Sequence, residues 1–393
     1  MIDYNETECA RLNRMLAAVR GYFRSTSLFL WMFCLCASCL SAMLVYSATR
    51  TNGMRTFITQ VAAISIGYVG AVILSLFDYK TLAKLWPVIA VGCLGLFAVT
   101  SIFGYTVPGT DDKAWLRIGS ISFQPSEMVK IGFIVTLAKH LDVLREKNKL
   151  RSFGHICLLL GHAMIPMAII HMQGDDGAAL VFLFIFLVMA FGAGVQLRYF
   201  ALFGAAVAAA VPLAWKFVLN DDQKMRFRIL LNHDLDPLHY GYQQSQGLIS
   251  IGSGKLFGRG YLKGPRVAAG IVPEDHNDFI YTVVGEEFGF VGCIVVILIL
   301  LAIVIAILRV GLRTQDALGK NICYGFMGLV AFQAISNIGM CLYVLPVVGI
   351  TLPFFSAGGS SAACLYFGVG LVQSVSRHRV TTPDMGMLAG ESS

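Results

Sequence analysis

The sequence is poor in charged residues. Only 13% of its 393 residues are Asp, Glu, Lys or Arg, and 56% are hydrophobic, whereas charged residues make up about 25% of an ordinary soluble protein. So few polar side chains cannot cover a folded surface in water. The composition therefore excludes a soluble enzyme, a disordered chain and a nucleic-acid-binding module, and it predicts an all-α polytopic membrane protein.

A disulfide framework is also missing. Nine of the ten cysteines lie in or beside apolar stretches, and the long polar segment 220–277 contains none. Disulfides usually staple small, polar secreted domains, so these thiols are predicted to be free and mostly buried.

Long apolar runs are abundant instead. A membrane-spanning helix needs about 20 mostly apolar residues. We predict about ten such helices, over residues 28–48, 56–77, 84–104, 126–142, 155–173, 176–194, 198–219, 279–308, 321–345 and 353–375.

The connecting segments differ in their content of basic residues. If the N-terminus is inside, the inner segments carry 17 Lys and Arg and the short outer loops carry four, as expected when basic loops stay in the cytoplasm. We therefore predict one membrane domain over residues 1–393 with both termini cytoplasmic. Its N-terminal segment is 1–27, its tail 380–393 is disordered, and a large outer loop, 220–277, joins the seventh and eighth helices.

This outer loop is not uniformly polar. The apolar stretches 248–251 and 256–257 indicate a part that lies on the membrane surface or dips into it. Basic residues follow the same stretch and are placed to attract an anionic head group: Lys255, Arg259, Lys263 and Arg266.

Charged residues inside a bilayer are costly and therefore mark candidate functional sites. Glu127 and Lys130 share a helical face behind Pro125, with Ser126 as the expected helix cap. They form either a neutralised structural pair or a polar cavity that grips a charged head group. In Gln173-Gly174-Asp175-Asp176-Gly177 the two acids either hold a cation or a sugar hydroxyl, or belong to a solvated turn.

Asp278 lies where the large outer loop enters the next helix. A carboxylate at the mouth of a half-apolar cleft tends to have a raised pKa, which suits a general base. The alternative is that Asn277 or Asp278 caps the helix. Thr282, Gly285 and Gly289 follow on the same face, which predicts a small helix face with room beside it.

The last apolar run contains Gly358-Gly359-Ser360-Ser361. Two glycines between serines predict a broken or closely packed helix. Gln333, Ser336 and Asn337 share a face of the preceding span and are expected to hydrogen-bond to this segment.

Several motifs, in this order, resemble those of the SEDS family (shape, elongation, division and sporulation). The resemblance covers about residues 28–378, and the short tails are more like those of its RodA branch than of its FtsW or sporulation branches. The motifs are Trp115-Leu116-Arg117, Gln124-Pro125-Ser126-Glu127, Gly241-Tyr242-Gln243, His276-Asn277-Asp278-Phe279, Gly285-Glu286-Glu287, Asn337-Ile338-Gly339 and Gly358-Gly359-Ser360-Ser361.

The resemblance implies a ten-helix peptidoglycan glycosyltransferase of the bacterial cytoplasmic membrane. Such an enzyme polymerises lipid II at the outer face, for cell elongation and shape, and works with a class B penicillin-binding protein. The family's essential aspartate falls on Asp278, its outer-loop tryptophan on Trp115, and its Glu–Lys pair on Glu127 and Lys130. The candidate substrate-binding residues are Trp115, Glu127, Lys130, Asp175, Lys255, Arg259, His276 and Ser360.

The implied reaction joins two lipid-linked sugars. Asp278 takes the proton of the acceptor's 4-hydroxyl, that oxygen attacks the donor's anomeric carbon, and undecaprenyl pyrophosphate leaves. A divalent cation, Mg²⁺ or Mn²⁺, or basic residues would stabilise the pyrophosphate, and no organic cofactor is expected. The partners are lipid II, undecaprenyl-pyrophosphate-linked glycan, the penicillin-binding protein and membrane lipid, with no nucleic acid.

The sequence also departs from the family pattern. Gly174 stands where a proline is usual, Asp176 where Leu or Phe is usual, and Asn277 where Thr is usual. Two other functions remain open: a lipid II flippase or transporter, and a non-catalytic scaffold for the transpeptidase.

Overall fold

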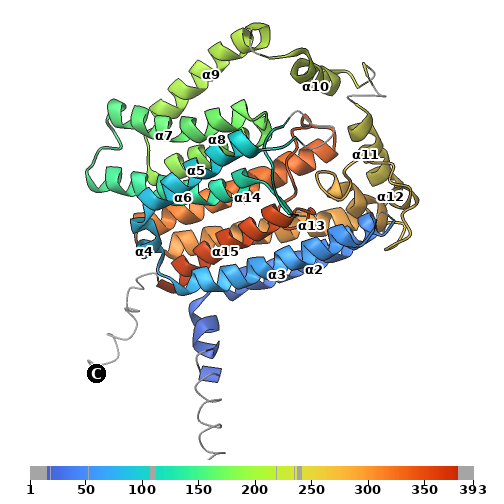
Figure 1. Ribbon diagram of the computed structural model, residues 1–393, viewed down its shortest axis with the longest axis horizontal. Coiled ribbons are helices and arrows are strands. Elements are labelled where there is room, and N and C mark those ends of the chain that lie inside the picture. Colours follow the sequence, from blue (N-terminus) through green and yellow to red (C-terminus); the bar gives the residue numbers. More distant parts are fainter. Residues whose placement is uncertain are drawn as a thin grey trace, which may run out of the picture.

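The computed structural model describes residues 16–17, 19–51, 53–106, 112–119, 121–217, 219–233, 235–236 and 241–378. Its long helices run side by side in one bundle, and the short helices of the large loop lie towards one end (Figure 1). The predicted tail 380–393 and most of the N-terminal segment 1–27 fall outside the described residues.

Eight described helices are long and apolar enough to cross a membrane. They are α2 (Leu28–Thr49), α3 (Arg55–Leu76), α5 (Trp86–Phe103), α7 (Phe153–Met172), α8 (Asp176–Ala193), α9 (Leu197–Phe217), α13 (Ile280–Arg313) and α14 (Ala317–Cys341). The predicted polytopic all-α membrane fold is confirmed.

Two further long helices lie within the bundle. α6 (Pro125–Glu146) packs against α5, α8 and α14, and α15 (Gly359–His378) packs along α3. Both carry more polar residues than the other eight, so their crossing of the membrane stays a prediction. α9 stands at the edge of the bundle, and none of its residues is buried (Figure 1).

The remaining elements are short. α4 (Tyr79–Lys84) joins α3 to α5, and the antiparallel strands β1 (Leu116–Ile118) and β2 (Ile121–Phe123) lie between α5 and α6. The predicted large outer loop contains α10 (Asp221–Leu231), α11 (Tyr242–Ser253) and α12 (Pro265–Ala268).

The predicted start of the last span, at residue 353, is wrong. α15 begins at Gly359, and the preceding residues form a turn in which Phe354 has φ +67°. Gln60 of α3 holds this turn, since its Nε2 donates to the carbonyl of Ser356 and its Oε1 accepts from the amide of Gly358. The glycine pair therefore marks the beginning of a helix.

The face predicted to be open on α13 is filled. Gly289 has φ +67° and ψ −162°, which breaks the helix and ends the regular face after Gly285. α11 packs along this part of α13. A Cβ on Gly285 would stand 2.8 Å from Cα of Ile251, so the small residue admits α11 and leaves no free space.

Candidate functional site

Asp278 lies just before α13, at its outer end in the predicted orientation. The cap of this helix is Phe279, and no side chain caps it, so the capping interpretation of Asn277 and Asp278 is wrong. Asn277 Nδ2 donates instead to Glu274 Oε2 over 2.7 Å. Among the described residues, no hydrogen bond reaches the half-buried carboxylate of Asp278, which leaves it available to a ligand.

Side chains of two other segments fix the position of Asp278 by hydrogen bonds to the backbone at and beside this residue. Asn337 Nδ2 donates to the carbonyl of Asp278 and to that of Ile350. Ser356 Oγ donates to the carbonyl of Asn277 over 2.6 Å. The expected bonds from Asn337 to the segment that contains the glycine pair are thus replaced by bonds to the carbonyls of Asp278 and Ile350.

The surroundings of Asp278 disfavour its charged form. Burial, followed by the negative charges of Glu274 and Asp175, raises the pKa of Asp278 to about 7, and the nearby His276 opposes this shift. Asp112, in the outer segment before β1, adds to the increase. A carboxylate that titrates near neutral pH is suited to general-base catalysis.

His276 is partly exposed beside two carboxylates. Its Nδ1 lies 3.6 Å from Asp275 Oδ1, and its Nε2 lies 4.0 Å from Glu274 Oε2. The contact with Asp275 is the main reason why the pKa of His276 is raised. The imidazole therefore stays protonated to a higher pH than usual.

Asp175 joins this group from the start of α8. Its Oδ1 accepts the amide of Ala178 as the helix cap, and its Oδ2 accepts Gln124 Nε2 over 2.9 Å. The helix start is thus kept without the family's proline. Burial raises the pKa of Asp175. The backbone amide of Gln124 also donates to Ser360 Oγ over 3.2 Å, which brings the start of α15 next to Gln124 and Asp175.

The Glu127–Lys130 pair forms as its spacing predicts. Lys130 Nζ lies 2.8 Å from Glu127 Oε1, and both side chains are buried. Their charges act on Asp175, so the pair belongs to the same polar region. The predicted capping role of Ser126 is wrong, because α6 has no side-chain cap and Ser126 Oγ is buried without a partner among the described residues.

Trp115 lies in the segment that leads into β1. Its carbonyl accepts the amide of Tyr105, and the amide of Lys113 donates to the carbonyl of Gln173. These bonds dock the segment against the outer ends of α5 and α7. The half-buried indole therefore lies on the same side of the bundle as Asp175.

Lys255 and Arg259 lie elsewhere. The amide of Arg259 donates to the carbonyl of Glu286, and the carbonyl of Lys255 accepts the amide of Phe290. Both residues thus lie about two turns or more along α13 from Asp278. The structure does not bring them together with the group around Asp278, and their role stays a prediction.

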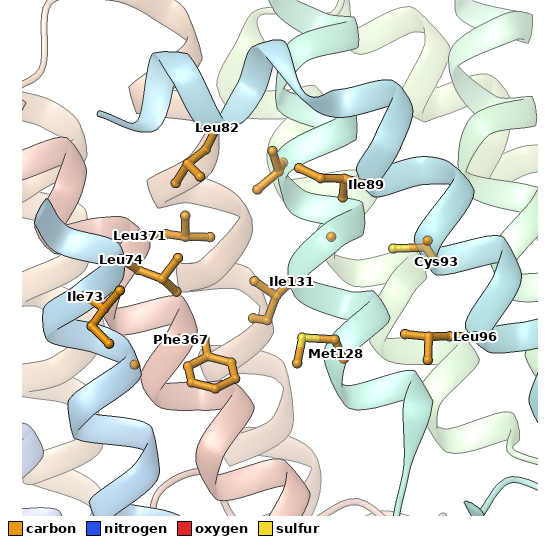
Figure 2. A pocket seen from close by; sticks show the side chains of 14 residues that line it. Ile73, Leu74, Leu82, Ile89, Cys93, Leu96, Met128, Ile131, Phe367 and Leu371 are labelled. Atoms are coloured by element: carbon orange, nitrogen blue, oxygen red, sulfur yellow. The ribbon is translucent and has the colours of Figure 1, made fainter. Parts of the chain in front are cut away.

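An apolar cavity of about 590 Å³ opens between α3, α4, α5, α6 and α15. Figure 2 shows Met128 and Ile131 of α6 facing Phe367 and Leu371 of α15 across it. These α6 residues are direct neighbours of Glu127 and Lys130 in the chain, so an apolar space adjoins the buried ion pair.

The expected divalent cation has no ready-made protein site in the described part of the chain. There, no three His, Cys, Asp or Glu side chains stand close enough together to hold a metal ion. Carboxylates near Asp278 are suitable donors for Mg²⁺, but their arrangement does not fit a bound ion.

These features define a multi-pass membrane protein with a carboxylate site at one end of its bundle. The profile of the family described as "Cell cycle protein", which covers FtsW, RodA and SpoVE, matches residues 23–381. The chain belongs to this family, the SEDS family, and is a multi-pass protein of the bacterial cytoplasmic membrane.

Curated relatives and solved structures agree with this family assignment. The chain is 31% identical to "Peptidoglycan glycosyltransferase MrdB" of Escherichia coli K12, over 86% of this chain and 90% of that protein. It is 33% identical to "Probable peptidoglycan glycosyltransferase FtsW" of Geobacter metallireducens, over 88% and 93%. A chain from the structure "Structural coordination of polymerization and crosslinking by a peptidoglycan synthase complex" superposes with a TM-score of 0.76 at 27% identity, over 90% and 98%. Proteins named MrdB and FtsW are thus both among its relatives.

Proposed function

We propose that this chain is a peptidoglycan glycosyltransferase that polymerises lipid II at the outer face of the membrane, for cell elongation and shape. The observation that carries the proposal is the carboxylate of Asp278. It is half-buried at the end of α13, accepts no hydrogen bond from the described residues, and has a pKa of about 7. The names of the relatives supply the reaction class.

In this mechanism Asp278 removes the proton from the 4-hydroxyl of the acceptor sugar. The oxygen then attacks the anomeric carbon of the donor, and the bond to undecaprenyl pyrophosphate breaks with inversion. Pyrophosphate is a good leaving group, so a single carboxylate suffices.

The other polar residues would bind the sugars and the pyrophosphate. Asp175 and Ser360 meet around Gln124, where they can hydrogen-bond to sugar hydroxyls, and Trp115 can stack on a sugar ring. The adjacent Asp275 raises the pKa of His276, which favours a positive charge on this side chain beside Asp278.

The apolar cavity fits the lipid part of such a substrate. Its lining consists of aliphatic, aromatic, Met, Cys and Gly side chains, which suit a polyprenyl chain. Glu127 and Lys130 adjoin it through α6, so one helix can contact both the lipid and the charged part of one molecule.

The proposed partner is a class B penicillin-binding protein. One structural neighbour belongs to a peptidoglycan synthase complex. Polymerisation and cross-linking act on the same strand, which makes a complex of the two enzymes useful.

The test is polymerisation of purified lipid II by the detergent-solubilised protein and a matching class B partner, in the presence of moenomycin. Wild type is expected to make glycan strands, and Asp278→Asn none. Asp142→Asn, which alters an ion pair with Lys139 at the other end of α6, is the matched control and should retain activity.

Three other outcomes would contradict the proposed function. Equal strands from wild type and Asp278→Asn exclude Asp278 as the base. If a folded wild-type complex makes no strands but moves lipid II across vesicles, the chain is a flippase. If it does neither but still binds the transpeptidase, it is a scaffold.

A further inference from the structure

α13 sets the depth of the neighbouring outer loop in the membrane. No charged residue lies between Glu287 and Arg309, and the 19 residues 290–308 span about 28 Å as a helix. This length matches the hydrocarbon core of a bilayer. Phe290 therefore marks the outer boundary of the hydrocarbon.

The loop 254–263 is fixed at this boundary by backbone bonds. The amide of Phe290 donates to the carbonyl of Lys255 over 2.9 Å, and that of Val291 donates to Leu256 over 3.1 Å. The break at Gly289 frees these amides from the helix, and at this depth they need a partner from the protein. The loop thus completes the helix and is held in place by it.

Apolar side chains of the loop face outwards at the same level. Leu256 is 52% exposed and Phe257 is 76% exposed. On the adjoining α11, Ile249 is also exposed. Exposed apolar residues at the edge of the hydrocarbon are suited to contact acyl chains.

Three basic side chains surround this apolar tip. Lys255, Arg259 and Lys263 are exposed, and among the described residues none of them forms an ion pair with a carboxylate. The nearby Glu286 and Glu287 are buried, and Glu286 accepts the backbone amides of residues 266 and 267. The loop therefore presents net positive charge at the level of the phosphates.

We propose that residues 254–263 form a binding site for an anionic phospholipid of the outer leaflet. Leu256 and Phe257 contact the acyl chains, and Lys255, Arg259 and Lys263 contact the head-group phosphate. The combination of an apolar tip at the hydrocarbon boundary with exposed cations one layer above it fits a lipid better than a protein partner. The proposal does not depend on catalysis.

The experiment uses the full chain in nanodiscs of phosphatidylcholine with increasing phosphatidylglycerol, and counts the retained lipids by native mass spectrometry. The test variant is Lys255→Gln/Arg259→Gln/Lys263→Gln. The matched control is Arg145→Gln/Lys147→Gln/Lys149→Gln, which removes three exposed cations at the opposite end of the bundle. The preference for phosphatidylglycerol is expected to fall at least about tenfold in the test variant and less than about twofold in the control.

Three further samples make the result specific. Phe257→Ser is expected to weaken retention of both lipids, whereas Lys255→Arg/Lys263→Arg, which keeps the charges, should behave as wild type. Undecaprenyl pyrophosphate in phosphatidylcholine nanodiscs tests the other source of a lipid-linked phosphate. The proposal is overturned if the test variant keeps its preference, if the control loses as much, or if only the pyrophosphate lipid depends on these residues.

Discussion

Asn337 holds Asp278 in place. The Nδ2 of this fully buried asparagine donates over 2.7 Å to the carbonyl of Asp278 and over 2.7 Å to that of Ile350. Beside Ile350, a Cβ on Gly349 would stand 3.7 Å from Asp278 Oδ2. A residue in the interior of α14 thus sets the distance between the carboxylate and the loop that faces it.

Replacing Asn337 should therefore impair the reaction step more than substrate binding. In Asn337→Ala two buried carbonyls lose their donor, which costs about 1–3 kcal/mol for each. We expect kcat for lipid II polymerisation to fall at least about tenfold while KM changes less than about threefold. Gln333→Ala, on the same helix, is the control. A fall in thermal stability with normal kcat would show that Asn337 is only structural.

The polymerisation rate should depend on pH through Asp278. The carboxylate acts as a base only when it is ionised, and its pKa is raised to about 7. The rate is expected to rise with pH, reach half its maximum near pH 7 and then level off. Among the neighbouring charges, that of Glu274 contributes most to the raised pKa of Asp278. Glu274→Gln removes this charge, so the pH profile of the variant should move to lower pH. An unchanged half-maximum in Glu274→Gln would exclude this electrostatic coupling.

The raised pKa of Asp278 also makes the stability of the fold depend on pH. Because the folded-state pKa lies above the usual value of 3.8, the folded protein binds this proton more tightly than the unfolded chain does. Stability contributed by Asp278 is therefore present at low pH and lost as the pH rises to about 7. Asp278→Asn should melt at or above the wild-type temperature at pH 8, and a lower melting temperature would contradict this.

The buried Glu127–Lys130 pair allows a double-mutant test. Glu127→Gln or Lys130→Met leaves one buried charge unpaired, which costs about 3–5 kcal/mol. The double variant removes both charges and is expected to recover most of the thermal stability. If the pair also binds substrate, as proposed, activity should stay low in the double variant. If the double variant recovers both thermal stability and activity, the pair has only a structural role.

A contact of Asp176 also leads to a prediction about the large loop. Asp176 Oδ2 accepts Gln223 Nε2 over 2.6 Å, and Arg226 Nη1 donates to the carbonyl of Val347 over 2.9 Å. These two bonds attach α10 beside Asp175 and beside the loop that faces Asp278. Asp176→Leu should increase amide hydrogen exchange in residues 221–231 at least about fivefold. Exchange elsewhere in α8 should stay unchanged, and equal protection of α10 would show that the contact is dispensable.

Much of the bundle follows from local sequence. Runs of apolar residues located most of the long helices to within a few positions, with the start of α15 as the exception. The i, i+3 spacing brought Glu127 and Lys130 together. Asp278 stood out through its position and its resemblance to a family motif. These features depend on neighbours in the chain, so a sequence pattern can show them.

The errors came from contacts between distant segments. Ser126 has the right type and position for a cap, but its Oγ is buried and has no hydrogen-bond partner in the described part of the chain. Asn337 meets a loop 59 residues away in sequence. The role of Gln60 in holding residues 356–358 had no local signal, although most buried polar side chains have a hydrogen-bond partner.

The break at Gly289 also divides α13 mechanically. Below it, residues 290–308 form a rod in the lipid, and above it a short arm carries Asp278 at its tip. The loop 254–263 is bonded to both sides of this glycine joint, so it connects the rod to the arm beside the helix itself. Asn337 and Ser356 hold the tip independently. The position of the carboxylate therefore depends on α14 and on the turn before α15 as much as on the membrane-embedded part of α13.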